Sequence, residues 1–300
     1  MNLPQNKINE IFQYYQNGIY KNVEKIIAIG DIHGDLQAFQ SCLRKAKVIN
    51  QENQWIGGKV HVVQVGDILD RKPRNDDQSD EDSEFLIIQL ICHLQIQSYL
   101  AGGGYHPVIG NHELMNILGI FDYVSPMGMR HFRNFNERKE FFRVGGDFCK
   151  YLACGWNPVI KINQSLFCHG GISKQSASKY TIQEINDMMR SKLFYKNSNL
   201  QEHEFQQLFM GDQGILWNRM YSHEGSETPY VFKSLIYVLQ KYQCKFLIIG
   251  HTPYTEGIKV KYNGHVICID TAMSRAFGKK RNHQERIHFI EISKNKVIIK

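Results

Sequence analysis

Short apolar runs that close on a glycine recur along the chain. They are KIIAIG (25–30), VHVVQVG (60–66), HPVIG (106–110), SLFCHGG (165–171) and FLIIG (246–250). Each run is rich in branched apolar residues and too short for a typical helix, a pattern typical of strands buried on both faces. The closing glycine allows a sharp backbone turn at the end of the strand. The pattern therefore predicts five buried strands with tight turns at their ends.

Two longer segments lie between the first three runs, at 36–46 and 85–100, and we expect both to be helical. Strands and helices that alternate in this way indicate a layered α/β sheet. Three later runs, VICID (266–270), RIHFIEI (286–292) and KVIIK (296–300), have no helix between them. They predict antiparallel strands that complete a second sheet.

The composition is that of an ordinary globular chain. Hydrophobic residues make up 42% and charged residues 22% of the 300 positions. These proportions exclude wholesale disorder and a collagen-like repeat, and the length suits a single α/β unit. No stretch approaches the ~20 apolar residues of a spanning helix, and the N-terminal segment lacks a signal-peptide pattern. We therefore expect no membrane association and, by default, a cytoplasmic protein.

The net charge limits the kinds of partner that the protein can bind, and the cysteine content indicates the redox state of its compartment. The net charge is +7, from 36 basic and 29 acidic residues. This charge suits an anionic substrate but falls short of the basic stripe of a nucleic-acid binder, so we expect no nucleic acid. The seven cysteines are an odd number without a C-x-x-C pair. They indicate reduced thiols and no disulfide framework.

An acidic insert, KPRNDDQSDEDSE, spans residues 72–84 and contains six acidic side chains. We interpret it as a solvated loop, with two alternatives left open. Residues 74–83 could bind a basic segment of a partner, or the loop could guard a neighbouring cleft. Residues 196–207 are polar enough to be another surface loop.

Polar motifs follow or close the predicted strands at five places: GDIHG (30–34), GDILDR (66–71), GNHE (110–113), HGG (169–171) and GHT (250–252). Active sites of open parallel sheets gather beyond the carboxyl ends of the strands. We therefore expect one set of side chains to converge there: Asp31, His33, Asp67, Asn111, His169 and His251. Carboxylate, imidazole and amide oxygen suit zinc, iron or manganese, and the absence of cysteine argues against a closed structural zinc site.

Such a donor set suits hydrolysis of a phosphate ester. Two metals that share a carboxylate can lower the pKa of a bridging water towards about 7 and hold two phosphate oxygens during in-line attack. Asp67 is the natural bridging carboxylate. His112 is placed to protonate the leaving oxygen, and Asp70 could orient that imidazole. The planar fork of Arg71 matches two phosphate oxygens.

These blocks and their order resemble the phosphoprotein phosphatase family of calcineurin-like metallophosphoesterases. Within it the chain is most similar to the Shewanella-like phosphatases, through GNHELMN (110–116), GILWNRMY (214–221) and the segment 137–173. The resemblance runs from about residue 25 to 278. It implies an α/β fold with a two-layer β-sandwich flanked by helices and a dinuclear metal site at the strand ends. Residues 1–22 would form an N-terminal helical extension, and 23–300 a single catalytic domain with the acidic insert.

The resemblance also assigns residues. Asp31, His33 and Asp67 match the ligands of the first metal, and the second metal's ligands match Asp67, Asn111, His169 and His251. His112 matches the general acid and Asp70 its partner. Arg71 matches a phosphate-contacting arginine, and Asn111 also lies where substrate binds.

The chain departs from the larger Ser/Thr phosphatases at two blocks. Lys72 and Pro73 replace the glycine of their DRG block, and LWxDP is present as LWNRM at 216–220. A second phosphate-binding arginine of those enzymes therefore has no clean counterpart. Arg219 is our first candidate for it and Arg275 our second.

The resemblance implies a metal-dependent phosphomonoester hydrolase, a protein phosphatase that uses a metal-bridging hydroxide and two ions of manganese, iron or zinc. Its substrate would be a phosphorylated protein or peptide. Phosphotyrosine and phosphoserine/threonine both stay open, because the Shewanella-like relatives include enzymes that prefer phosphotyrosine. One alternative is a dinucleoside polyphosphate hydrolase or phosphodiesterase on the same scaffold. Another is a non-catalytic scaffold that binds phosphoproteins, which predicts a missing ligand or acid, yet none is missing.

Overall fold

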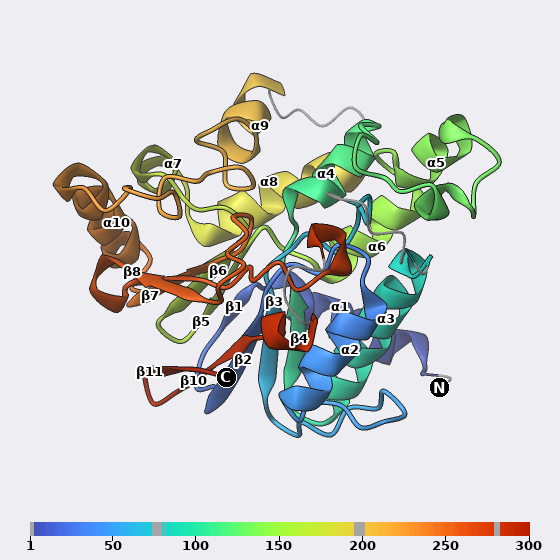
Figure 1. Ribbon diagram of the computed structural model, residues 1–300, viewed down its shortest axis with the longest axis horizontal. Coiled ribbons are helices and arrows are strands. Elements are labelled where there is room, and N and C mark those ends of the chain that lie inside the picture. The colour runs from blue at the N-terminus through green and yellow to red at the C-terminus, as the bar shows by residue number, and fades with distance from the viewer. Residues whose placement is uncertain (1–2, 74–79, 81, 195–201, 279–282) are drawn as a thin grey trace.

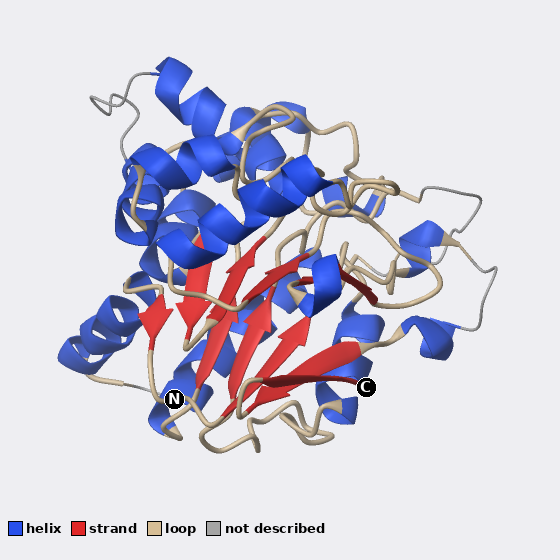
Figure 2. Cartoon of the chain, turned by 90° about the vertical axis from the view of Figure 1, so that its left-hand side faces the viewer, coloured by secondary structure: helices blue, strands red, loops and turns tan. Residues whose placement is uncertain are grey.

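Two β-sheets stack on each other, and helices surround the pair (Figure 2). The computed structural model describes residues 3–73, 80, 82–194, 202–278 and 283–300. Across the six-stranded sheet, the order is β1 (Ile19–Tyr20), β5 (Val159–Ile162), β6 (Ser165–Cys168), β7 (Phe246–Ile249), β9 (Val266–Cys268) and β8 (Lys259–Lys261). Across the five-stranded sheet, it is β11 (Lys296–Ile299), β10 (Phe289–Ser293), β2 (Lys25–Ile29), β3 (His61–Gln64) and β4 (Gly104–Pro107).

The α-helices occupy the segments between and beside these strands (Figure 1). They are α1 (Gln5–Gln16), α2 (Leu36–Lys45), α3 (Glu84–Leu100), α4 (Asn111–Leu118), α5 (Phe135–Phe142), α6 (Asp147–Gly155), α7 (Lys174–Lys179), α8 (Ile182–Phe194), α9 (Glu202–Phe209) and α10 (Pro229–Lys241). Short 3₁₀ helices cover Met127–Met129, Tyr262–Gly264, Arg275–Phe277 and His283–Arg286. No helix among the described residues is long and apolar enough to cross a membrane.

The apolar core has two parts, because successive side chains of a strand point to opposite faces. On β2, Ile26 and Ala28 belong to the cluster between the two sheets. Ile27 and Ile29 belong to the outer cluster, which also holds Phe39 of α2. All five are buried, and each large apolar side chain contributes about 1.5–3 kcal/mol on burial. Both faces of the strand are therefore covered, as its uninterrupted apolar run predicts.

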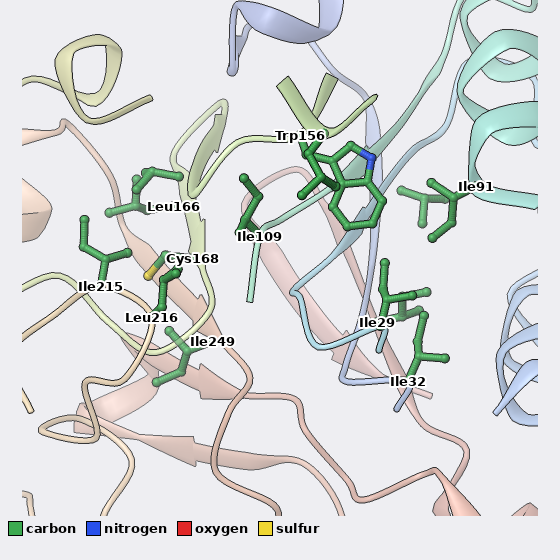
Figure 3. Close-up of a cluster of buried hydrophobic side chains, with 14 of the residues drawn as sticks. Ile29, Ile32, Ile91, Ile109, Trp156, Leu166, Cys168, Ile215, Leu216 and Ile249 are labelled. Carbon is green, nitrogen blue, oxygen red and sulfur yellow. The ribbon is translucent and has the colours of Figure 1, made fainter. Parts of the chain in front are cut away.

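Figure 3 shows part of the outer cluster on both sides of the sandwich. Ile29 lies on the side of Ile91 from α3, while Leu166 of β6 and Ile249 of β7 lie on the other side with Ile215. All of them are fully buried. The predicted two-layer sandwich flanked by helices is thus confirmed, and so are the five glycine-closed strands and both early helices.

The prediction that all the late runs complete the second sheet is wrong for two of them. Strand β9 does join the six-stranded sheet, but β10 pairs with β2 and extends the five-stranded one. Lys294 and Asn295 connect β10 to β11, both with positive φ, at 48° and 57°. Such a two-residue turn favours a tight antiparallel hairpin. The free edge of β2 therefore accepts the C-terminal hairpin, whose Ile290 and Ile292 enter the core between the sheets.

The polar segments need two corrections. Glu84 was counted with the solvated insert, but it is buried at the start of α3 because Arg138 pairs with it at 3.3 Å. The polar segment 196–207 is not a loop throughout, since α9 begins at Glu202. Residues 74–79 and 81, which carry most of the predicted partner segment 74–83, lie outside the described residues.

In the predicted N-terminal extension, β1 pairs with β5 of the six-stranded sheet. All seven cysteines are free thiols.

A buried pair of histidines lies at the start of β3 and in β4. His61 Nδ1 is 2.9 Å from His106 Nε2, and the two rings stack with centroids 5.0 Å apart. The hydrogen bond requires one donor and one acceptor, which two neutral rings supply. Burial lowers the pKa of His61 to about 4. Burial and the neighbouring His61 lower the pKa of His106 well below its usual value.

The protein should therefore lose stability as the pH falls below 6.5. Unfolded histidine takes up a proton near pH 6.5, whereas His61 in the folded protein does so only near 4, a difference of about 2 kcal/mol at pH 5. A His61→Gln variant removes this titration while its amide can still donate to His106. Urea unfolding at pH 7, 6 and 5 should show a smaller loss for the variant than for the wild type. Equal losses would contradict the prediction.

Candidate active site and metal centre

A cavity of about 1040 Å³ lies where strands of both sheets end. His33 follows β2, Asp67 follows β3 and Asn111 follows β4, while His251 follows β7 and Asp270 follows β9. All five line the cavity. The carboxyl ends of parallel strands from both sheets therefore meet at one edge, which is where polar side chains of such sheets assemble a site.

Two glycines allow the loops to come close enough for this. A Cβ on Gly110 would lie 2.3 Å from both the backbone nitrogen and Oδ1 of Asp67. A Cβ on Gly250 would lie 2.1 Å from Oδ1 of Asp31. Both distances are far below any ordinary contact. The glycines that close these strands are thus required for the approach of one backbone to another carboxylate, in addition to any turn.

Three of the predicted ligands adopt left-handed backbone conformations. The φ angles are 41° at His33, 54° at Asp67 and 66° at His251. Such angles are uncommon outside glycine, and each costs roughly 1–3 kcal/mol. Neighbouring contacts hold the backbone there, since His33 N donates to Asp67 O at 2.9 Å. Local strain concentrated on candidate ligands is a feature of functional sites.

The carboxylate of Asp67 lies at the centre of the site. Its Oδ2 is 3.7 Å from His33 Nε2, 3.8 Å from His112 Nε2 and 3.2 Å from His169 Nε2. Two groups of possible ligand atoms share this residue, His33–Asp67–His112 and Asp67–His169–His251. The atoms within each group all lie within 4.8 Å of one another. Asp67 is therefore the carboxylate that the two groups have in common.

Backbone carbonyls orient two of the imidazoles. His33 Nδ1 lies 3.2 Å from Leu69 O, and His169 Nδ1 lies 2.8 Å from Val65 O. Because a carbonyl only accepts, Nδ1 of each ring carries the proton. Nε2 of each ring then faces Asp67, and in the neutral ring its lone pair is available to a metal. Asn111 Oδ1, another predicted ligand, is 2.8 Å from His169 Nε2.

Two buried ligand atoms lack a hydrogen bond among the described residues, Oδ1 of Asp31 and Nε2 of His251. The other oxygen of Asp31 accepts from His251 N at 3.0 Å, which places the two residues side by side. A buried polar atom without a partner costs about 1–3 kcal/mol. Cations would satisfy both atoms, so the residues present fit a metal centre.

The pKa directions describe a centre that is ready for positive charge. Burial, with the charges of Asp270 and Asp67, raises the pKa of Asp31 well above its usual range. Burial and the neighbouring His169 lower the pKa of His251 to about 2. Burial also opposes the charge of Asp67, but His169 and His112 outweigh it and hold that pKa well below its usual range. A divalent ion would relieve the crowded carboxylates without needing a protonated His251.

His112 lies on the cavity side of α4 and is held by Asp70. Its Nδ1 is 2.6 Å from Asp70 Oδ2, and its backbone nitrogen donates to Asp67 Oδ1 at 3.0 Å. The ring stands edge-on to those of His33 and Tyr123, with centroids 4.9 Å and 5.0 Å away. With Nδ1 turned to Asp70, Nε2 faces the cavity. The predicted pairing of His112 with Asp70 is present in this geometry.

The three candidate arginines have different surroundings. Arg219 lines the cavity and donates from Nη1 to His251 O at 2.8 Å and to Thr252 Oγ1 at 2.7 Å. Arg71 is buried, with Nη2 3.8 Å from Asp35. Arg275 does not line the cavity, because Asp35 accepts from its Nε at 2.9 Å and from its Nη2 at 3.0 Å. Asp35 also accepts from Ala38 N and so caps α2.

Two site residues escaped the sequence analysis. Glu113 accepts from the backbone nitrogens of Gly110, Asp67, Ile68 and Leu69 at 2.8–3.1 Å. Burial and the charge of Asp67 raise its pKa to about 7. Asp270 is buried beside the cavity, and burial and Asp67 raise its pKa to about 6. The sequence did contain a signal for each. Glu113 ends the motif GNHE and Asp270 ends the run VICID, so both acids follow or close a predicted strand.

The chain matches the family model of the calcineurin-like phosphoesterases over residues 24–254. It is 32% identical to Shewanella-like protein phosphatase 1 of Plasmodium berghei, over 87% of this chain and 70% of that one. It is 26% identical to Shewanella-like protein phosphatase 2 of Arabidopsis thaliana, over 89% of this chain and 75% of that one.

Solved structures share the fold. The cold-active protein-tyrosine phosphatase of a psychrophilic Shewanella species superposes with a TM-score of 0.77 at 24% identity, over 94% of this chain and 79% of that one. A protein serine/threonine phosphatase of Saccharomyces cerevisiae superposes with a TM-score of 0.58 at 14% identity, over 99% and 89%. At these identities the likeness shows the architecture alone.

Proposed function

The chain belongs to the calcineurin-like phosphoesterases, and within them to the Shewanella-like protein phosphatases, and from this membership we propose that it is a metal-dependent protein phosphatase. The observation that carries the proposal is the position of Asp67, whose carboxylate is shared by two groups of candidate ligands. Its substrate is a phosphorylated protein or peptide, in which a phosphomonoester is hydrolysed. The names of the relatives support phosphoproteins as the substrate class.

In this proposal two divalent ions, of manganese, iron or zinc, are held by the six predicted ligands. Asp31, His33 and Asp67 hold one, and Asp67, Asn111, His169 and His251 hold the other. When bound, the ions would supply a nucleophile at neutral pH and positive charge beside the phosphate oxygens. The buried atoms of Asp31 and His251 that lack a hydrogen bond support this assignment.

The protein's own side chains handle the proton of the leaving group. Because Asp70 accepts from His112 Nδ1, the imidazole presents Nε2 to the cavity. We assign to His112 Nε2–H the proton that the departing hydroxyl or phenol oxygen takes up as its bond to phosphorus breaks. The carboxylate of Asp70 stabilises the imidazolium before that transfer. Arg219, which lines the cavity, is our candidate for holding a phosphate oxygen, and Arg71 is a further candidate.

Activity should disappear on chelation and return with manganese. We expect protein stripped with a chelator to hydrolyse neither an aryl phosphate nor a phosphopeptide, because the ions would supply the nucleophile at neutral pH. Elemental analysis before and after reloading should find about two ions per chain when turnover returns. Full turnover in excess chelator would contradict the proposal.

A substrate panel distinguishes the substrate classes. Phosphotyrosyl and phosphoseryl or phosphothreonyl peptides should be tested beside diadenosine tetraphosphate with the same Mn²⁺-loaded protein. We expect at least one phosphopeptide to turn over faster than the dinucleotide. The opposite order would reassign the chain to the hydrolysis of nucleotides while leaving the metal centre intact.

A further inference from the structure

The Asp70 carboxylate is held through both of its oxygens. Oδ2 lies 2.6 Å from His112 Nδ1, and Oδ1 accepts from Asn116 Nδ2 at 2.8 Å. Asp70 N donates to Glu84 Oε1 at 2.7 Å. Asn116 Nδ2 also lies 3.0 Å from His112 O, one turn earlier on α4. The side chain that orients the imidazole is thus itself oriented by an amide on the same helix.

Arg138 sets the orientation of that amide. Its Nε and Nη2 donate to Asn116 Oδ1 at 3.1 Å and 2.7 Å. An arginine has no acceptor, so only the oxygen of the amide can face it. The NH₂ group must then face Asp70, whose carboxylate can only accept. With the amide turned the other way, its oxygen would meet the carboxylate and both contacts would be repulsive.

Arg138 is fully buried on α5, outside the two sheets. Its Nη1 donates to Gly128 O at 2.6 Å, and its Nη2 lies 3.3 Å from Glu84 Oε2. The guanidinium faces the rings of Phe121, Phe132 and Phe142 at 5.6, 5.5 and 4.6 Å. Glu84 also accepts a hydrogen bond from Asp70 N. The contacts of Asp70, Asn116, Arg138 and Glu84 therefore form a closed ring. A buried charge is held here by an acid, an amide and a carbonyl, so its position is tightly defined.

We propose that Arg138 and Asn116 are positioning residues, which hold the Asp70–His112 pair in the geometry that delivers a proton to the leaving oxygen. The inference rests on the acid role proposed for His112. It follows from the unbroken sequence of contacts His112–Asp70–Asn116–Arg138. Neither positioning residue lines the cavity, so their loss should affect the proton transfer selectively.

The test compares substrates that differ in their need for an acid. Dinitrophenyl phosphate releases a stable anion that departs without a proton, whereas phenyl phosphate releases a basic oxygen that requires one. Asn116→Leu removes the hydrogen bond to Asp70 and those from Arg138 without burying a new charge. Arg138→Met removes the guanidinium, and Arg138→Lys keeps the charge and one donor. All are assayed with Mn²⁺ beside His112→Asn, with thermal melting and metal content measured for each.

We expect Asn116→Leu and Arg138→Met to lower kcat on phenyl phosphate by about 10- to 100-fold. Their kcat on dinitrophenyl phosphate should change far less, and Arg138→Lys should recover part of the loss. In the double variant with His112→Asn, Asn116→Leu should add little, because its effect passes through His112. Arg190→Met is the matched control, since Arg190 does not line the cavity and donates to Gln16 O at the end of α1 and to Asn157 Oδ1 before β5. It should leave the ratio of the two rates unchanged.

Equal losses on both substrates would overturn the inference, because they indicate a purely structural role. So would independent, multiplicative effects in the double variant. If Arg138→Met does not fold, Asn116→Leu and Arg138→Lys carry the same test. If His112→Asn itself shows no dependence on the leaving group, the acid role fails and the inference with it. If only the Asn116 and Arg138 variants lack that dependence, the acid role stands and the positioning role fails.

Discussion

An Asp67→Asn variant is expected to lose at least about 10³-fold in kcat/KM. The substitution should weaken metal binding, and bound metals contribute several kcal/mol of transition-state stabilisation. Asparagine keeps the shape of the side chain, and one oxygen can still accept from His112 N, as Asp67 Oδ1 does at 3.0 Å. It removes the negative charge at Oδ2, which lies 3.2–3.8 Å from three imidazoles. Elemental analysis should find fewer than two ions per chain, and steady-state assays with Mn²⁺ should give the lost rate.

The control for this variant is Asp147→Asn, which changes the same charge at a side chain that is 84% exposed on α6. It should retain wild-type turnover and metal content. Circular dichroism of both variants separates loss of the metals from loss of the fold. An Asp67→Asn protein that binds two ions and turns over normally would remove Asp67 from the bridging position.

His112→Asn should lower kcat on a phosphopeptide by about 10²–10⁴-fold while both ions stay bound. The expected loss is large because asparagine carries no titratable proton, so the leaving oxygen departs as an anion. The limb of the pH–rate profile that reports His112 should vanish together with the rate. Stopped assays between pH 5 and 9, with metal content measured in parallel, provide both readouts.

His112 also belongs to one of the groups of possible metal ligands, with His33 and Asp67. The metal content of the His112→Asn variant therefore distinguishes a ligand from a general acid. If His112→Asn loses an ion along with its activity, His112 is a ligand and the acid must be sought elsewhere. Unchanged turnover would exclude both roles.

The strand ends and the convergence of the candidate ligands could be predicted because both depend on local pattern. A buried strand reads as an apolar run, and the polar residue after its glycine must emerge at the sheet edge. Asp67 and His251 are 184 positions apart in the chain, yet each follows such a run, so their convergence follows from the parallel topology. The pairing of His112 with Asp70 was expected from the need to orient a general acid, and the family resemblance also implied it.

The contacts that depend on tertiary partners could not be predicted. Arg275 looked like a phosphate ligand, but Asp35 accepts its guanidinium, and nothing near either residue in the chain indicates that pairing. Glu84 was hidden in an acidic run, although Arg138 makes its burial possible. The sequence of β10 predicts a strand but not the sheet to which it belongs. It joins the five-stranded sheet because it pairs with the edge of β2. In each case the partner lies more than 50 residues away.

Glu113 has a consequence for how the protein acquires its ions. Its carboxylate gathers the backbone of Gly110 and of Asp67, Ile68 and Leu69, so the turns after β3 and β4 are tied together by protein alone. The turns are therefore already ordered in the folded protein. The entropy cost of ordering them does not weaken the binding of cations. Apoprotein should hold a preassembled cradle, and reloading should proceed at the pace of diffusion and dehydration, without a slow refolding phase.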